Sequence, residues 1–156
     1  MKKQSLPGIS IAIAVVDIQK ASRLYQKLGF RETMTIDGQD GKLAVSILEL
    51  GPSMLILGPV DDPHYYNHKR AEQIKKGPRG LGVVPLITVS DLAKVYEIVK
   101  KEGLEILLEP MDEYYGDRIF MFLDPDGYEW KIHQPIQKVR KKDIAENLES
   151  AGFKVK

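Results

Sequence analysis

Cysteine is absent from this chain of 156 residues, which excludes a disulfide framework, a thiolate nucleophile and any zinc or iron–sulfur centre with cysteine ligands. The net charge of only +1 gives no overall attraction to nucleic acid or to an anionic membrane. The apolar run near the N-terminus, residues 9–16, is far shorter than the roughly 18 residues of a membrane span, and no small-residue cleavage site follows it. We therefore expect a cytoplasmic protein that binds neither nucleic acid nor membranes.

An internal duplication is the most informative feature that is present. The two halves of the chain repeat each other at an offset of 74 residues, so that Asp17 corresponds to Asp91. The matching positions that follow are Ile18, Ala21, Leu24, Gly29 and Phe30 in the first half and Leu92, Val95, Ile98, Gly103 and Leu104 in the second. Their spacing is that of one face of a helix about three turns long, which a glycine then ends.

Each copy begins with a short run rich in β-branched residues, 9–16 and 83–89, and both runs predict strands. Asp17 follows the first run directly and Asp91 follows the second after Ser90, where an aspartate can cap the next helix. Further strands are predicted after each helix, at residues 44–50 and 54–57 in the first half and at 106–109, 119–123 and 128–132 in the second.

The pattern predicts an α+β fold of two βαβββ modules, residues 8–59 and 80–135, that form curved mixed sheets around a cup. Residues 60–79 are expected to be a linker with one helical turn at 71–75, and the modules together to form one domain, 1–136. The extension 137–156 is expected to contain a short helix that ends at Gly152. Because neither module could bury a large core alone, we expect the modules to pack on each other or across a homodimer.

Two stretches carry a resemblance to a known family. One is Val15-Val16-Asp17 with Tyr25 and Leu28-Gly29-Phe30, and the other is residues 116–128, in which a strand runs into the turn Asp124-Pro125-Asp126-Gly127-Tyr128. Over residues 8–135 the chain resembles the vicinal oxygen chelate superfamily, which includes glyoxalase I, extradiol dioxygenases, fosfomycin-resistance enzymes and bleomycin-resistance proteins. Asp124 and Asp126 are expected to form the turn rather than to act as acids.

The resemblance implies a divalent metal in the cup, held by one ligand from the first and one from the last strand of each module. The corresponding positions here are Ser10, Ile56, Val84 and Lys131. Serine is a weak donor, valine and isoleucine offer none, and lysine brings a positive charge, so we expect neither a metal nor another cofactor. A rival metal site would use His64 and His68, four residues apart in the linker.

Strand parity predicts the lining of the cup. Ala12 and Leu86 are expected to accompany Ser10 and Val84. The resemblance implies that the strand beside Lys131 contributes Ile119 and Met121 to the same face. Arg118, Phe120 and Phe122 then point to the opposite face. This lining describes a mostly apolar pocket with one ammonium group, suited to an apolar or aromatic molecule that bears an anionic or electron-rich group.

Some roles stay open at this point. Lys131 could meet a ligand anion, act as a Schiff-base or general-base lysine, reach solvent, or pair with Glu129 or Glu49. Glu129 and His133 share its face and are expected to form a polar pair or to neutralise it in part. Tyr115, with Tyr114, could form a mobile flap over the pocket or a simple loop anchor.

We therefore expect a metal-independent protein that binds a small-molecule ligand and resembles the bleomycin-resistance proteins, which sequester drugs without transforming them. The first alternative is a metal-dependent lyase or dioxygenase of the same superfamily. The second is an interaction module whose cup is filled by its own side chains and whose C-terminal helix mediates assembly.

Overall fold

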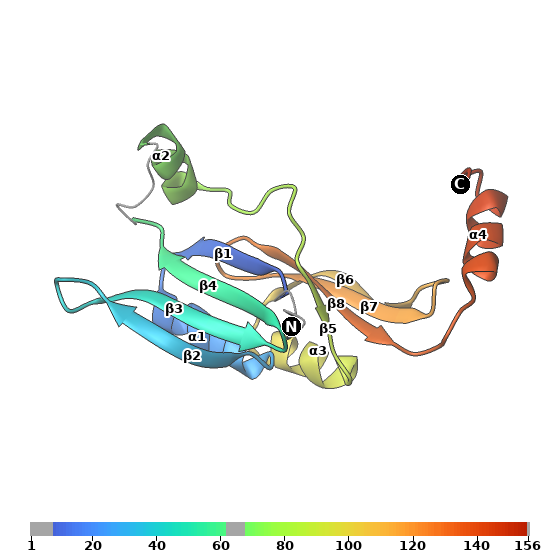
Figure 1. Ribbon diagram of the computed structural model, residues 1–156, viewed down its shortest axis with the longest axis horizontal. Coiled ribbons are helices and arrows are strands. Elements are labelled where there is room, and N and C mark those ends of the chain that lie inside the picture. Colours follow the sequence, from blue (N-terminus) through green and yellow to red (C-terminus); the bar gives the residue numbers. More distant parts are fainter. Residues whose placement is uncertain (1–7, 62–67, 156) are drawn as a thin grey trace, which may run out of the picture. The chain divides into compact units, whose positions relative to one another are not determined.

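The computed structural model describes residues 8–61 and 68–155, except for the side chain of His68. Figure 1 shows the order of the elements along the chain. They are β1 (Ser10–Val15), α1 (Ile18–Lys27), β2 (Arg31–Asp37), β3 (Leu43–Leu50), β4 (Ser53–Pro59), α2 (His68–Lys76), β5 (Leu86–Thr88), α3 (Leu92–Lys101), β6 (Glu105–Asp112), β7 (Asp117–Leu123), β8 (Glu129–Pro135) and α4 (Lys141–Ser150).

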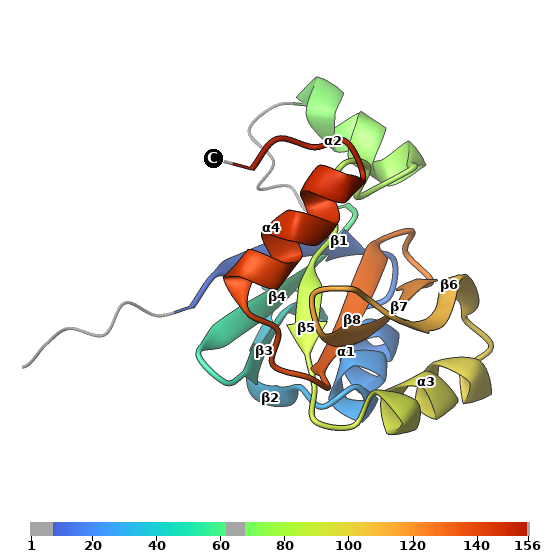
Figure 2. The ribbon, with the colours of Figure 1, turned by 90° about the vertical axis from the view of Figure 1, so that its right-hand side faces the viewer.

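The chain divides into two compact units, residues 1–79 and 80–156, and each contains one four-stranded sheet. The strand order is β1-β4-β3-β2 in the first sheet and β5-β8-β7-β6 in the second. Figure 2 shows the strands of the second sheet labelled in this order. In both sheets the first strand pairs in parallel with the last, and the other neighbours are antiparallel. The predicted α+β fold of two βαβββ modules with a C-terminal helix is confirmed.

The helix of each module covers one face of its sheet, and the two helices begin in the same way. Asp17 and Asp91 accept hydrogen bonds from the backbone N–H groups of Lys20 and Lys94, each at 3.0 Å. Both aspartates are therefore N-caps, as the sequence predicts. The buried apolar side chains include Ile13, Val15, Ile18, Ala21, Leu24, Tyr25, Leu48, Leu55 and Leu57 in the first unit, and Ile87, Leu92, Val95, Val99, Phe120, Phe122, Trp130 and Ile132 in the second.

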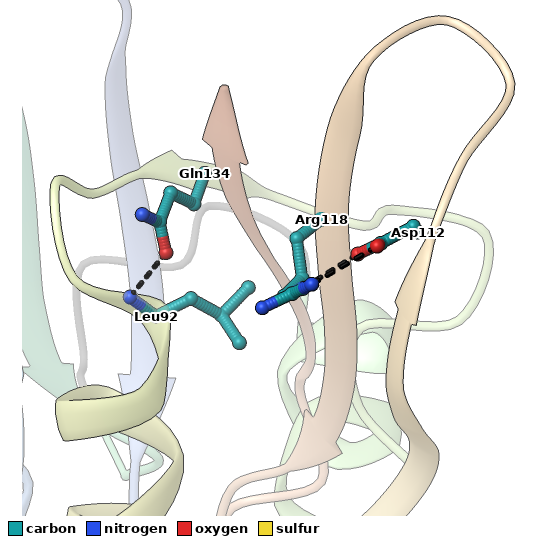
Figure 3. A network of polar contacts seen from close by, with 4 residues as sticks. All are labelled: Leu92, Asp112, Arg118 and Gln134. Carbon is teal, nitrogen blue, oxygen red and sulfur yellow. Dashed lines mark hydrogen bonds and ion pairs between the residues drawn. The ribbon is translucent and has the colours of Figure 1, made fainter. Parts of the chain in front are cut away.

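Two polar contacts connect the elements of the second module (Figure 3). The side-chain oxygen of Gln134, at the end of β8, accepts a hydrogen bond of 2.9 Å from the backbone N–H of Leu92. This contact joins the last strand to the first turn of α3, where backbone donors have no partner inside the helix. Arg118 on β7 binds both carboxylate oxygens of Asp112 on β6, at 2.5 and 2.9 Å.

The turn between β7 and β8 is organised by a single buried carboxylate. One oxygen of Asp124 accepts hydrogen bonds of 2.9 Å from the backbone N–H groups of Asp126 and Tyr128, and the other accepts one of 3.2 Å from the indole of Trp130. Gly127 takes a φ of 89°, a left-handed conformation that favours glycine. Asp124 is thus a turn former, as expected.

Three boundaries differ from the sequence prediction. Residues 31–37 form β2, the third strand after the helix that the βαβββ plan requires in the first half but to which the prediction assigned no residues; most of its side chains are exposed. β5 covers only Leu86–Thr88, after Pro85, which has no N–H to donate to a ladder. α2 is a nine-residue helix rather than a single turn.

The extension after β8 carries α4, which starts at Lys141 and has no buried residue. Its first turn is fixed by Arg140, whose guanidinium binds both oxygens of Asp143 at 2.7 and 2.8 Å. In the part of the chain that the structure describes, no helix combines the length and the apolar character needed to cross a membrane.

We expect Asp124→Ala to lower the free energy of unfolding by about 3 kcal/mol, because it leaves three donors around a buried site without their acceptor. Urea denaturation followed by circular dichroism measures this change. Asp124→Asn, which keeps one oxygen, should fall between the wild type and Asp124→Ala. A loss below about 0.5 kcal/mol, the usual range of a surface substitution, would contradict this account of the turn.

Candidate functional site

The face of the second sheet that points away from α3, called here the helix-free face, contains most of the predicted site residues of this unit. Trp130 and Ile132 on β8 are buried on the opposite side, where Phe120 meets the ring of Tyr96 from α3. Because successive side chains of a strand alternate, Lys131 and His133 lie on the helix-free face.

Strand register brings the predicted neighbours of Lys131 together. Lys131 is paired with Leu86 of β5 on one side and with Met121 of β7 on the other. Leu86 is 61% exposed, Met121 and Lys131 are half-buried, and Ile119, further along β7, is buried. The predicted parity of β7, with Ile119 and Met121 opposite Phe120 and Phe122, is therefore present in the structure.

The predicted site residues of the first unit form a separate group. Ser10 and Ala12 are exposed on β1, and Ala12 is paired with Ile56 of β4. These positions face away from Leu55 and Leu57, which are buried. Val84 precedes β5 and takes no part in its ladder, so the expectation that a strand at 83–89 aligns Val84 with Leu86 is wrong.

Lys131 has no acidic partner among the residues that the structure describes. Of the two partners considered, Glu49 binds Arg31 on β2 at 2.9 Å, and Glu129 forms no ion pair with Lys131. The backbone N–H of Lys131 donates to the carbonyl of Pro85 at 3.0 Å, which fixes the strand but leaves the side chain unpaired. An ammonium group on a half-buried apolar surface therefore lacks a protein counter-ion there.

His133 pairs with a different carboxylate from the one expected. Its Nδ1 lies 3.0 Å from Oδ2 of Asp117, at the start of β7, rather than against Glu129. The register explains this pairing, because His133 lies opposite Ile119 and Asp117 points to the same face two residues earlier. Asp117 was missed because the partner of a strand residue depends on register, which the sequence did not supply.

Tyr115 lies in the turn between β6 and β7, in edge-to-face contact with Tyr114 at a centroid distance of 5.2 Å. The carbonyl of Gly116 in the same turn accepts hydrogen bonds from the backbone N–H groups of Ile136 and Gln137, at 2.9 and 3.0 Å. A side chain at position 116 would collide with the carbonyl of Gln137. The turn is therefore tied to the chain that follows β8, as the loop-anchor interpretation expects.

The donors at the expected metal positions do not fit a divalent cation. Lys131 carries a positive charge, and its neighbours Leu86 and Met121 offer no anionic or imidazole ligand. Within residues 8–61 and 69–155, no group of three or more histidine, aspartate or glutamate side chains is gathered as a metal site. Of the rival ligands, His64 and the side chain of His68 lie outside the described residues.

A polar cleft of about 420 Å³, not anticipated from the sequence, lies on the helix side of the first sheet, between α1 and the hairpin of β2 and β3. In it one carboxylate oxygen of Glu32 accepts hydrogen bonds from the hydroxyls of Ser22 and Ser46, at 2.6 and 2.7 Å. These hydrogen bonds, that of Ser22 first, lower the pKa of Glu32 below its ordinary value of 4.5.

The second module has a cleft of about 410 Å³ at the corresponding place, between α3 and β6. The ion pair of Arg118 and Asp112 lies in its wall (Figure 3). Close by, the hydroxyl of Tyr96 donates to Glu109, which raises the pKa of that phenol. Polar groups thus border both clefts, but their side chains are not conserved between the modules.

One family model matches most of the chain. The model of the Glyoxalase/Bleomycin resistance protein/Dioxygenase superfamily matches residues 9–132. An uncharacterized protein of Mycobacterium bovis is 27% identical over 150 residues, which cover 94% of this chain and 95% of that protein.

Two solved structures are similar in fold. A glyoxalase/bleomycin resistance protein/dioxygenase family enzyme from Burkholderia phytofirmans PsJN has a TM-score of 0.65 at 20% identity and covers 81% of this chain and 97% of its own. TioX from Micromonospora sp. ML1 has a TM-score of 0.62 at 18% identity and covers 82% and 98%. At these identities the likeness shows the fold alone.

The stability of the first unit should depend on pH through Glu32. Because the folded-state pKa of Glu32 is lowered, its contribution is complete above about 4.5 and is lost as the pH falls through the folded-state value. Glu32→Gln should therefore unfold at lower urea concentration at neutral pH, by about 1 kcal/mol, and should lose less stability on acidification than the wild type.

Urea titrations between about pH 7 and pH 3 measure both effects. The matched control is Glu105→Gln, which removes an exposed carboxylate that forms no hydrogen bond in the described structure. Parallel pH profiles for the wild type and Glu32→Gln would show that the two serine hydroxyls do not favour the ionised form of Glu32.

Proposed function

The chain belongs to the Glyoxalase/Bleomycin resistance protein/Dioxygenase superfamily, and from this premise we propose that it is a metal-independent small-molecule-binding protein similar to the bleomycin-resistance proteins. Its ligand is an apolar or aromatic molecule that bears an anionic group. The binding surface is the helix-free face of the second sheet, around Lys131.

One observation carries this proposal: Lys131 lies between Leu86 and Met121 without a carboxylate partner among the described residues. The two apolar neighbours offer contact area to an apolar body, and the ammonium group offers a charge-assisted hydrogen bond to an anion. A ligand anion would also supply the counter-ion that the half-buried amine lacks. The same lysine at this position argues against the metal-dependent alternative, a lyase or dioxygenase of the superfamily.

The remaining candidate residues are divided between the two units. Ser10 and Ala12 are exposed on β1 of the first sheet and Ile56 is half-buried on β4 beside Ala12, while Val84 and Tyr115 lie just outside the strands of the second sheet. We propose that the residues of each group contribute to ligand binding on the sheet of their own unit. We further propose that the protein acts in the cytoplasm. We also propose that it is a homodimer, because modules of this size bury little core alone and α4 has no buried residue.

Lys131→Met should weaken the binding of benzoate, the simplest aromatic anion, by about tenfold or more, because it removes a hydrogen bond to a charged group. Isothermal titration calorimetry measures the affinity, and the ligand-induced rise in melting temperature checks it independently. Lys94→Met is the matched control, since it removes the same charge from an exposed position on α3. Equal affinity of the wild type and Lys131→Met for benzoate, or no binding by either, would contradict the proposal.

The metal-dependent alternative is decided by elemental analysis of protein purified without chelator. The proposal expects far less than one equivalent of any transition metal per chain, with benzoate binding unchanged after dialysis against EDTA. A metal content close to one equivalent that EDTA removes together with ligand binding would favour a lyase or dioxygenase.

A further inference from the structure

A bulge in β2 shapes the wall of the polar cleft in the first unit. The register shifts between Glu32 and Met34, so that Glu32, Thr35 and Asp37 all line the cleft on the side of α1, although Glu32 and Thr35 are three residues apart. The facing wall is a single polar stripe of α1, made of Gln19, Ser22, Arg23 and Gln26. The volume of about 420 Å³ lies in the range of small-molecule pockets.

Glu32 is a fixed negative charge in this wall. Ser22 and Ser46, which are 3% and 0% exposed, donate to the same carboxylate oxygen at 2.6 and 2.7 Å. Ser22 in turn accepts a hydrogen bond of 3.1 Å from the side-chain nitrogen of Gln26. Because these donors are neutral, they hold the carboxylate in place without cancelling its charge. The lowered pKa of Glu32 keeps it ionised at neutral pH.

The cleft of the second module treats its charges differently. There Asp112 pairs with Arg118 at 2.5 Å, and Glu97 pairs with Lys100 at 2.6 Å. These carboxylates are neutralised by cations of the protein itself. In the first module the carboxylate of Glu32 is held by hydroxyl groups, so its charge stays available to a cation that enters the cleft.

Three charged residues line the cleft of the first module, two of them negative and one positive. Arg23 directly follows Ser22, whose hydroxyl binds Glu32, so a guanidinium and a carboxylate belong to the same end of the cleft. Asp37 lies five residues beyond Glu32, which places their Cα atoms at most about 16 Å apart on the strand. A complementary ligand carries an ammonium and a carboxylate group side by side and a second cation at its far end.

We propose that this cleft binds a free basic α-amino acid, for which L-lysine is the probe. The α-ammonium group meets Glu32, the α-carboxylate meets Arg23, and the side-chain ammonium group meets Asp37. The two nitrogens of extended L-lysine are about 7 Å apart, and with a hydrogen bond at each end the ligand spans about 13 Å. This site lies on the helix side of the first sheet and is separate from the surface around Lys131.

A series of ligands tests each charge without any substitution in the protein. Cadaverine lacks the carboxylate, N-α-acetyl-L-lysine lacks the charged α-amino group, and L-norleucine lacks the side-chain ammonium group. Each should bind about tenfold or more weakly than L-lysine, because one hydrogen bond between charged groups is lost. Titration of the ¹⁵N-labelled full chain measures the affinities, and the amide shifts caused by L-lysine should gather on α1 and β2.

Three variants remove the partners one at a time. Glu32→Gln, Arg23→Gln and Asp37→Asn should each weaken L-lysine binding about tenfold or more. In Asp37→Asn, L-lysine should also lose its advantage over L-norleucine, since the side-chain ammonium group no longer has a carboxylate to meet. Glu105→Gln, which removes an exposed carboxylate from β6, is the control and should bind L-lysine like the wild type. Circular dichroism checks that each variant is folded.

The outcomes decide the proposal in either direction. Cadaverine binding as tightly as L-lysine would overturn it, because the carboxylate would then contribute nothing. Unchanged L-lysine affinity in folded Glu32→Gln, amide shifts confined to elements other than α1 and β2, or no binding of L-lysine would overturn it as well. The benzoate experiments concern the other unit, so a failure there and a failure here are separate results.

Discussion

The pleat of β8 determines the chemistry of the second sheet. Trp130 and Ile132 must point toward α3, because their apolar surfaces are buried there among Phe120 and Phe122. Because successive side chains of a strand point to opposite faces, Lys131 and His133 lie on the face away from α3. The core thus presents an ammonium group and an imidazole side by side, and the hydrogen bond of Trp130 to Asp124 holds the strand in that register.

Local features of the fold were predictable from the sequence because they depend on neighbouring residues. Asp17 and Asp91 cap their helices through donors three residues away, and Asp124 forms a turn within its own segment. The parity of β7 followed from alternation together with the place that the family resemblance implies for this strand. β2 was expected from the βαβββ plan but was given no residues, although Met34 and Ile36 alternate with Thr33 and Thr35.

The polar contacts of the site depend on the register between strands from distant segments, and the sequence pattern does not predict this register. His133 was expected to meet Glu129 on its own strand, whereas register brings it to Asp117 on the neighbouring one. The group of Ser22, Glu32 and Ser46 joins a helix and two strands and was missed for the same reason. Lys131 lies on the helix-free face of β8, and its lack of a carboxylate partner among the described residues became visible only once its neighbours were placed.

In this protein, membership of the family does not determine which side chains occupy the candidate site. The family model matches residues 9–132, yet Lys131 stands at the position where the sequence resemblance implies an acidic metal ligand. The two modules of this chain likewise share a fold but differ in the side chains of their clefts. They share a backbone plan and a cleft at corresponding places, but one cleft contains a glutamate held by serines and the other a tyrosine and an arginine. The shared scaffold leaves the reactive side chains free to diverge.

The backbone N–H groups of Ile136 and Gln137 both donate to the carbonyl of Gly116, so the turn that contains Tyr115 is held to the segment that follows β8. Trimming the chain after Pro135 to obtain a minimal domain would therefore loosen the loop that carries Tyr115, some twenty residues upstream. A protein shortened in this way would therefore differ from the 156-residue chain in ligand-binding experiments. A force applied to the segment after β8 would be transmitted through these hydrogen bonds to the loop of Tyr115.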